Sequence, residues 1–392
     1  MADDNPQDWM YGKITDEALA QMRANLGELG PVGPPSDPYT RNQIIRYLAS
    51  VGDDNPLYFD EDYAKKTRWG GITAPPRMLL QGVTLTPKTV QEPPPKDGKS
   101  FSAQDQLQGV FAMISGMRIV FEQPVRVGDT LTAQSGPHDV IERQSRMAGR
   151  AVEQMMRTIH RNQRGEVVAT VYNSVIRMER GQARENRKYL DLPQAKYTDE
   201  EIAALSAQYK QEAGHRRGAE PRYFEDTNVG DSLITLAKGP LTITDIVAYF
   251  LGQEAIYYTN RVKHLELIAY PSKRLVNTET NVEDEWTAAH WDEYFAKFSG
   301  IPRPYDEGPM RYDDMTHLVT DWMGDDATLR EITVTLRAPN LIGDLSWCTG
   351  KVAARRQEEG RSLVDLMLWI TNQRGEKTTL GTAVVELPTR PQ

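Results

Sequence analysis

The hydrophobic pattern of the chain follows the same plan twice. Residues 40–51 carry apolar side chains at helical spacing, with Thr40 as the expected N-cap. Residues 77–83 are apolar on most faces and predict a second helix, and residues 310–322 predict its counterpart in the other half. Alternating segments predict antiparallel strands over 117–121, 130–135, 150–161, 166–178, 330–337, 346–355, 363–372 and 378–387. The pattern therefore indicates an α+β protein with two sheets, each wrapped around one long helix.

Short sequence matches support a duplication. Residues 162–166, Asn-Gln-Arg-Gly-Glu, recur at 372–376 with an offset of 210. Three further matches occur in the same order: 44–47 with 246–249 (offset 202), Asp60-Glu61 with Asp292-Glu293 (offset 232) and Pro124…Gly128-Asp129 with Pro339…Gly343-Asp344 (offset 215). Four matches in one order are not expected by chance, so the two halves are copies of one unit.

The changing offsets locate the insertions and suggest domain bounds. The second half gains 30 residues within about 253–281, and the first half is longer by 17, in a region that includes the Pro-rich loop 91–98. We predict an N-terminal extension (1–36), a first unit (37–180), a basic linker (181–222) with a helix near 199–211, and a second unit (223–392). The aromatic insertion, over 253–289, is expected to cover the mouth of a groove between the units and to shape a pocket for a bulky acyl group.

Composition limits the functional classes. The net charge of -9 shows no basic excess of the kind that nucleic-acid surfaces carry. No apolar run is long enough for a membrane helix and no secretory signal is visible, so we expect a cytoplasmic protein. The single cysteine, Cys348, lies in a strand-like run and is expected to be a buried, unreactive thiol.

The first half resembles a known family. The run Gly52-Asp53-Asp54-Asn55-Pro56-Leu57-Tyr58, followed by the small-residue turn 70–76, is similar to the motif of MaoC-like dehydratases. The duplicated length resembles the double-hotdog acyl-CoA hydratases of that family. The resemblance implies a tandem hotdog fold and an acyl-CoA substrate, with coenzyme A as substrate carrier and no other cofactor or metal.

The family's chemistry needs a carboxylate and a histidine, five residues apart, to serve one water. A backbone N–H at the start of the central helix stabilises the thioester oxyanion. In the first half Asp53 and Asn55 match the motif, but Tyr58 stands in the place of the histidine. Because tyrosine is a poor base at neutral pH, the first half is predicted to be non-catalytic and to line the substrate groove.

In the second half the repeat places His290 over Tyr58 and Glu285 over Asp53. The resemblance implies a dyad of His290 with Glu285 or with its neighbour Asp284. Gly308, in the turn before the second central helix, is the candidate for oxyanion stabilisation.

Tyr305, Asp306 and Arg311 flank the same turn and are candidate substrate-binding residues, as are Tyr58, Asp53 and Asn55 of the first half. Asp306 is better interpreted as a helix cap than as an acid, and Arg311 would pair with a substrate carboxylate or with Asp306. His317, among apolar helix residues, is interpreted as a core histidine.

The sequence thus predicts a hydro-lyase that adds or removes water at the α,β-position of an acyl thioester, in fatty-acid, branched-acid or polycyclic acyl catabolism. Two alternatives stay open. One is a non-catalytic hotdog subunit that completes the groove of a partner hydratase, and the other is an acyl-CoA thioesterase. A homo-oligomer or a hetero-oligomer with another hotdog subunit is expected, without nucleic-acid or membrane partners.

Overall fold

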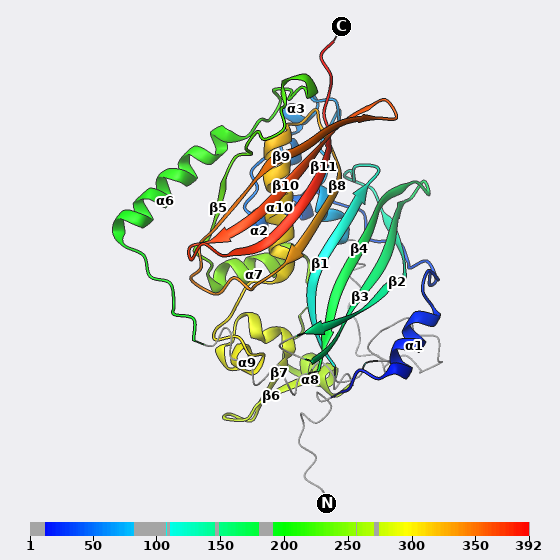
Figure 1. The fold of residues 1–392 in the computed structure, drawn as a ribbon, viewed down its shortest axis with the longest axis vertical. Helices are drawn as coiled ribbons and strands as arrows, with labels where there is room; N and C mark the ends of the chain where they lie inside the picture. Colours follow the sequence, from blue (N-terminus) through cyan, green and yellow to red (C-terminus); the bar gives the residue numbers. More distant parts are fainter. Residues whose placement is uncertain are drawn as a thin grey trace, which may run out of the picture.

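A computed structural model of the chain describes residues 12–81, 107, 110–145, 149–179, 191–255, 257–269 and 274–391. Its long strands form two groups, one in each half of the sequence (Figure 1). The strands of the first half are β1 Phe111–Phe121, β2 Leu131–Ser145, β3 Gly149–Asn162 and β4 Val167–Met178. Those of the second are β5 Leu236–Lys238, β8 Thr328–Leu336, β9 Ser346–Glu358, β10 Arg361–Asn372 and β11 Lys377–Glu386. All eight predicted strands are present, most of them longer than expected.

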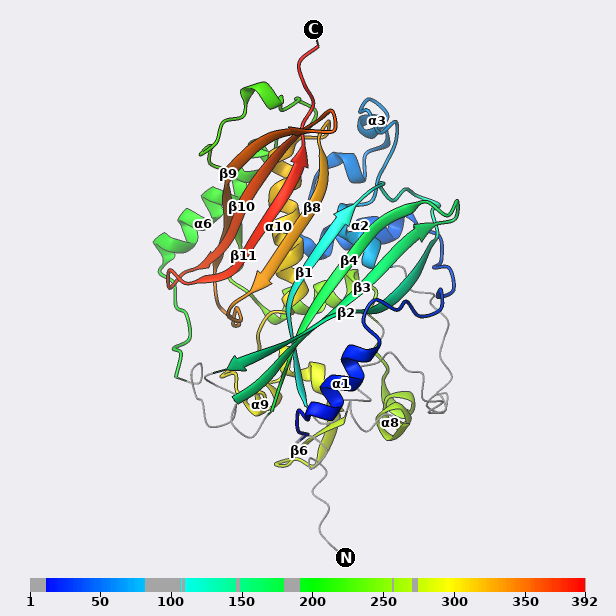
Figure 2. The same ribbon diagram turned by 45° about the vertical axis from the view of Figure 1, so that its right-hand side comes forward.

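These nine strands form a single antiparallel sheet, in the order β2-β3-β4-β1-β8-β11-β10-β9-β5. The two halves join where β1 pairs with β8, from Gly116 opposite Thr335 to Val120 opposite Glu331. Any side chain at Gly116 would begin 2.7 Å from the Val334 carbonyl oxygen, so glycine allows the close approach of the strands. The sheets of the two copies are therefore joined into one continuous curved sheet (Figure 2).

The central helix and two shorter helices lie on the same face of this sheet, the face of the main core. The long central helix α10, Gly308–Met323, crosses the face of β8–β11, and all but a few of its residues are buried (Figure 1). Helix α2, Arg41–Val51, packs against its counterpart α7, Ile243–Gly252. Thr40 and Thr242 begin these helices with the same capping box, as the duplication predicts.

Short elements complete the two copies. The first copy has α1 Asp16–Ala24, α3 Glu61–Ala64 and 3-10 helices over Pro56–Tyr58 and Pro76–Gln81. The second has a 3-10 helix over Trp286–His290 and α9 Glu293–Phe298, preceded by α6 Asp199–Glu212 in the linker and 3-10 helices over Ala213–His215 and Phe224–Asp226. The predicted helix over 77–83 is thus a 3-10 helix as far as Gln81. Its last two residues, the Pro-rich loop 91–98 and linker residues 181–190 lie outside the described residues.

The insertion of the second copy contains α8 Asn260–Ala269 and the hairpin β6 Arg274–Asn277 with β7 Val282–Glu285. Leu275 packs against Ala288, Ala289 and Phe295, so the hairpin is joined to the segment that ends in His290. Ile256 and Tyr270, two of the insertion's apolar residues, lie outside the described residues.

The repeated Asn-Gln-Arg-Gly-Glu sequences form the same hairpin turn in both copies. The side-chain oxygen of Asn162 accepts from the Arg164 N–H at 3.0 Å, and that of Asn372 accepts from the Arg374 N–H at 3.0 Å. The glutamine of each turn donates to the aspartate of the repeated Gly-Asp pair, Asp129 or Asp344. The sequence match therefore marks a structural equivalence.

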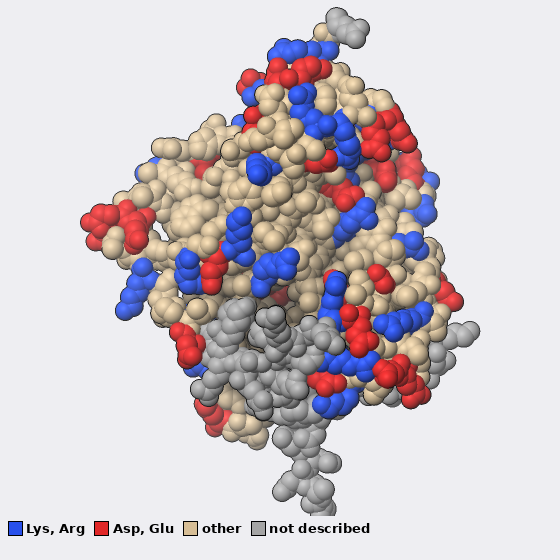
Figure 3. Space-filling model, viewed as in Figure 1, with Lys and Arg blue, Asp and Glu red and all other residues tan. Residues whose placement is uncertain are grey.

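The surface and the core agree with the composition. Lys and Arg side chains are interspersed with Asp and Glu on the face drawn in Figure 3. Within the described part of the chain, no helix has the length and hydropathy needed to cross a membrane. Cys348 is fully buried and burial raises the pKa of its thiol well above the usual value, which fits the unreactive role expected of it.

Candidate active site

The two copies bring equivalent backbone to the start of each central helix. Thr73 forms an isolated bridge with Arg126 in the first copy, and Tyr305 forms one with Leu341 in the second. Tyr305 follows Thr73 at the offset of 232, and Leu341 follows Arg126 at the offset of 215, so the two bridges are equivalent. The four positions Tyr58, Thr73, Ala74 and Pro75 therefore correspond to His290, Tyr305, Asp306 and Glu307.

His290 lies at the start of α10 in contact with two groups. Its Nδ1 is 2.9 Å from the Tyr305 carbonyl oxygen, and its Nε2 is 2.6 Å from a carboxylate oxygen of Glu307. A carbonyl oxygen only accepts, so Nδ1 carries a proton, and the short Nε2–O distance requires a second proton between the imidazole and the carboxylate. The pair thus holds one proton that it can give or take.

The surroundings of His290 favour its charged form. The side chain is 5% exposed, and burial alone would lower the pKa of the imidazole. The carboxylate of Glu307, together with the Tyr305 carbonyl and the charge of Asp306, outweighs burial and raises the pKa above its ordinary value. Phe250 and Tyr305 lie beside the ring, with centroids 6.1 and 4.5 Å away. A perturbed titratable pair at a helix start is a candidate for acid–base chemistry.

The carboxylate on His290 differs from the predicted one. Asp284 lies on β7, where its carboxylate is 2.6 Å from Lys263 Nζ, and Glu285 accepts a 3.4 Å hydrogen bond from Thr287. The inserted hairpin holds both residues in its own strand pairing, Glu285 opposite Arg274 and Asp284 opposite Leu275. The expected pairing of His290 with Glu285 or Asp284 is therefore replaced by a pairing with Glu307, which sequence reasoning missed. The signal in the sequence that could have identified Glu307 is its position directly before Gly308.

Asp306 and Arg311 form a buried ion pair beside this site. The Arg311 Nε lies 2.8 Å from Asp306, which also accepts from the backbone N–H of Asn340 at 3.0 Å. Burial raises the pKa of Asp306 to about 6, although Arg311 opposes the shift. The N-cap position of α10 belongs to Glu307, so Asp306 braces the helix start instead of capping it. Of the two partners considered for Arg311, the structure has Asp306.

Gly308 is the first residue of α10 and directly follows Glu307. The N–H groups of the first helical turn lack acceptors within the helix, and the helix dipole favours negative charge there. A Cβ at this position would lie 2.7 Å from the Leu336 side chain. The predicted oxyanion donor is thus adjacent to the acid–base pair, as the resemblance implies.

The first copy lacks an equivalent pair. Tyr58 stands in place of His290 and Pro75 in place of Glu307. Burial, followed by the charge of Asp53, raises the pKa of Tyr58 well above its usual value, so its hydroxyl stays protonated. Asp53 and Asn55 instead organise the loop: Asp53 accepts from the Asn55 N–H and Asn55 from the Leu57 N–H.

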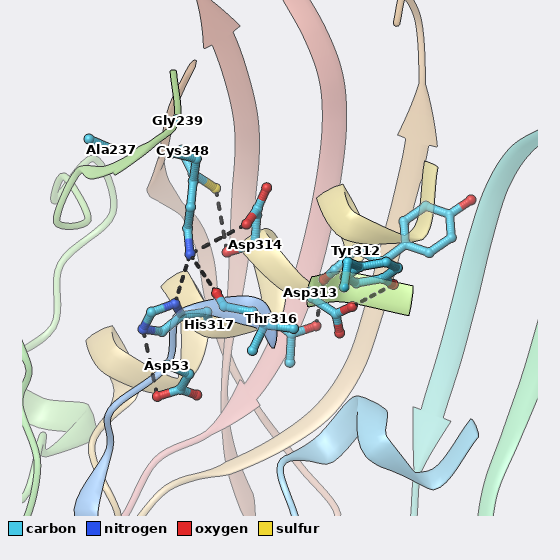
Figure 4. Close-up of polar contacts among 12 residues, drawn as sticks. Asp53, Ala237, Gly239, Tyr312, Asp313, Asp314, Thr316, His317 and Cys348 are labelled. Atoms are coloured by element: carbon cyan, nitrogen blue, oxygen red, sulfur yellow. Dashed lines mark hydrogen bonds and ion pairs between the residues drawn. The ribbon is translucent and has the colours of Figure 1, made fainter. Parts of the chain in front are cut away.

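A second polar cluster surrounds His317, which the sequence suggested to be a core histidine. It is buried, but it also lines a cavity of about 380 Å³. Lys238 Nζ lies 3.0 Å from His317 Nδ1 and 3.4 Å from Asp314 (Figure 4). His317 Nε2 lies 3.3 Å from Asp321 and 3.7 Å from Asp53. Asp53 thus meets a histidine of the other copy, a contact that no sequence spacing predicts.

The atoms of Asp53, His317 and Asp321 are close enough to one another to hold a metal ion, within 4.8 Å. The surrounding cations oppose this use. Burial alone would lower the pKa of Lys238, but the neighbouring acidic groups, Asp314 foremost, together raise it and keep Lys238 protonated. Lys238 therefore donates to Nδ1, and Nε2, the atom a metal would need, is the ring nitrogen that carries the proton. Arg216 already pairs with Asp321 at 2.9 Å. The cluster fits a hydrogen-bond network across the two copies better than a metal centre.

Sequence comparisons point to one family. Residues 31–171 match the model of the FAS1-like, dehydratase domain region. A UPF0336 protein of Streptomyces avermitilis is 28% identical over 157 residues, which is 40% of this chain and 95% of the relative. The alpha subunit of 3-oxo-4,17-pregnadiene-20-carboxyl-CoA hydratase from Mycobacterium tuberculosis is 37% identical over 65 residues, 16% of this chain and 20% of that protein.

Solved structures extend the likeness to the whole chain. A MaoC-like dehydratase superimposes with a TM-score of 0.61 at 17% identity, covering 94% of this chain and all of the other. A conserved protein of Mycobacterium tuberculosis, described as a double hotdog, superimposes with a TM-score of 0.52 at 14% identity, covering 93% of this chain and 97% of the other. The predicted double-hotdog fold is confirmed.

Proposed function

We propose that the chain is a MaoC-like hotdog dehydratase that hydrates or dehydrates an acyl thioester at the α,β-position, a proposal supported by the family match of its residues 31–171 and by its double-hotdog fold. The observation that carries the proposal is the His290–Glu307 pair, which shares a proton at the start of the helix that begins with Gly308. The pair occurs in the second copy and is replaced by Tyr58 and Pro75 in the first.

The chemistry follows from the contacts of the pair. In hydration, Glu307 takes a proton from the water whose oxygen attacks the β-carbon, and His290 gives its Nε2 proton to the α-carbon. The pair ends with as many protons as it began with. The N–H groups of the first turn of α10, at Gly308, stabilise the enolate oxygen that forms between the two steps. Dehydration follows the same path in reverse.

Enoyl-thioester hydration by the purified full chain tests the proposal. We expect the chain to consume a crotonyl thioester, and His290→Gln and Glu307→Gln each to lower kcat/KM by about 100-fold or more, the usual contribution of general acid–base catalysis. His264→Gln is the matched control, because this side chain is 63% exposed on α8. An inactive wild-type chain, or an active His290→Gln variant, would contradict the proposal.

The same assay addresses the two alternatives. Release of free thiol without loss of the enoyl group would identify a thioesterase. Activity that appears only with a second hotdog protein would identify a subunit that needs a partner, so the homo- or hetero-oligomer stays a prediction. The second copy carries its own acid–base pair within this chain, which favours an enzyme that acts without such a partner.

The acyl group is proposed from the insertion. Tyr257 packs edge-on against Phe250 and Trp291, with centroids 5.3 and 5.6 Å away, and Phe250 lies beside His290. This aromatic wall supports a bulky branched or polycyclic acyl group over a short linear one. Replacing α8 and the β6–β7 hairpin by a short linker should change the chain-length preference, and an unchanged preference would remove this part of the proposal.

A further inference from the structure

The first copy keeps a pocket at the position where its acid–base pair is missing. A cavity of about 600 Å³ is lined by Tyr58, Thr73, Ala74 and Pro76. These residues are the equivalents of His290, Tyr305, Asp306 and Gly308 at the offset of 232. The volume lies within the range of pockets that bind small molecules.

Part of the lining of this first-copy pocket is apolar, and it comes from both halves of the chain. Side chains from the first copy meet the end of α10 and the start of β8 there. The apolar lining residues are Leu57, Leu79, Phe121, Val125, Met323 and Leu329. Such a lining suits a hydrocarbon chain.

Five arginines line the same pocket: Arg68, Arg126, Arg164, Arg330 and Arg361. Arg164 pairs with Glu166 at 2.8 Å and Arg330 with Glu386 at 2.6 Å. Among the residues that the structure describes, Arg68, Arg126 and Arg361 form no ion pair, while Glu122 and Asp325 supply the acidic groups of the lining. Basic side chains are visible near the upper ends of β8–β11 in Figure 3.

The guanidiniums of Arg68 and Arg126 are held by backbone carbonyls. Arg126 donates to the Trp69 carbonyl oxygen at 2.8 Å, and Arg68 donates to that of Ala327 at 3.0 Å and lies 4.2 Å from the centre of the Trp69 ring. Burial lowers the pKa of Arg68 from its usual value, and the charges of Asp326 and Glu386 offset only part of this effect. These guanidiniums are held in place without a direct ion pair, so they can donate to an anion in the pocket.

The second copy provides an internal comparison. The equivalents of Arg68 and Arg126 are Gly300 and Leu341, at offsets of 232 and 215. The duplicated fold therefore does not require arginine at either position. The copy that lacks the acid–base pair is the one that carries these charges.

We propose that the first-copy pocket binds a phosphorylated acyl thioester without converting it, with the acyl chain in the apolar interior and a phosphate on Arg68, Arg126 and Arg361. The ligand class rests on the proposed function of the second copy. The shared chemistry is an acyl phosphopantetheine, supplied either by an acyl-CoA or by an acylated carrier protein. The pocket is a second, non-catalytic site in the same chain.

Calorimetric binding of octanoyl-CoA, which has no double bond to hydrate, tests this site. We expect two sites in the full chain, and one of them should weaken by about tenfold or more in Arg126→Leu/Arg361→Gln, because two charge-assisted contacts are lost. Arg126→Leu introduces the residue of the second copy. Arg361→Gln alone should give a smaller loss of affinity. Because Arg361 is exposed, this single variant also tests the site if the double variant does not fold. The control is Arg143→Gln, because Arg143 lies on β2 outside the pocket and pairs there with Glu153.

Each outcome decides one part of the proposal. If octanoyl-CoA and CoA bind with equal affinity, the pocket does not bind the acyl chain and the proposal is contradicted. If inorganic phosphate competes as well as octanoyl-CoA, the pocket is a simple anion site and the proposal is contradicted as well. An octanoylated carrier protein and octanoyl-CoA are then compared with each other. Either result supports the proposal, and the one that binds more tightly identifies the source of the acyl phosphopantetheine. Crotonyl-thioester turnover by the double variant should equal that of the wild type. If octanoyl-CoA binding depends on the arginines but the chain does not turn over the crotonyl thioester, only the proposed function is contradicted. If the chain turns over the crotonyl thioester but binding does not depend on the arginines, only the second site is contradicted.

Discussion

At the scale of single residues, the candidate site depends on one carboxylate. Glu307 is the foremost of the groups that oppose the effect of burial on His290 and raise the pKa of the imidazole. In hydration the protonated imidazole is the form that gives a proton to the α-carbon, so the basic limb of the pH–rate profile should follow the pKa of His290.

Glu307→Gln tests this coupling through the pH profile. Removing the negative charge leaves burial as the dominant influence, which lowers the pKa of His290, so the basic limb of kcat/KM for hydration should move to lower pH. The rate at the optimum should fall as well, because the group that activates water is gone. Asp306→Asn is the comparison, since Asp306 acts on His290 less strongly than Glu307 does. A rate loss without any shift of the limb would indicate that Glu307 serves only to hold the local structure.

The residue scale also marks the limit of sequence reasoning. The repeat located His290, since its offset from Tyr58 is that of the repeated Asp-Glu pair. The prediction of its partner was wrong because the five-residue spacing of the family motif points to Glu285. In the structure the inserted β6–β7 hairpin changes the direction of the chain before His290. His317 and Lys238 come from α10 and β5, and only the folded arrangement brings them to Asp53.

At the scale of the elements, strands and turns were predictable because local chemistry specifies them. The alternation of apolar residues located the eight long strands, and the repeated turn sequences located two hairpins. The helix predicted over residues 77–83 is a 3-10 helix as far as Gln81, a distinction that the spacing of apolar residues does not make in so short a run.

The two repeated turns allow a matched stability prediction. Asp344 is 2% exposed, accepts from the Leu341 N–H and pairs with Arg374 through both of its oxygens. In the first copy Asp129 lies 3.7 Å from Arg164, which is 56% exposed. Asp344→Ala should lower the free energy of unfolding by about 2–3 kcal/mol, from lost charge-assisted hydrogen bonds. Asp129→Ala should cost about 1 kcal/mol less, because exposed ion pairs contribute little. Urea denaturation measures both, and equal losses would show that the better ion pair adds nothing.

At the scale of the whole molecule, the two copies meet around one buried charge. Asp313 on α10 accepts hydrogen bonds from Tyr47 of α2 and from its counterpart Tyr249 of α7, and it forms an ion pair with Arg77. Arg77 and Asp313 have side chains only 5% and 1% exposed. The duplication thus delivers equivalent tyrosines from both copies to a single carboxylate, an arrangement that the repeat alone could not reveal.

This network predicts how the halves hold together. Asp313→Asn leaves the Arg77 guanidinium buried without its partner, and the free energy of unfolding should fall by about 3–5 kcal/mol. Tyr47→Phe and Tyr249→Phe each remove one hydrogen bond and should each cost about 1 kcal/mol. Arg77→Met/Asp313→Leu removes both charges together and should recover most of the loss, since buried pairs can often be replaced by apolar groups of similar size. If Asp313→Asn costs no more than Tyr47→Phe, the ion pair is not what joins the copies, and their stability rests on the β1–β8 pairing and the packing of α2 against α7 instead.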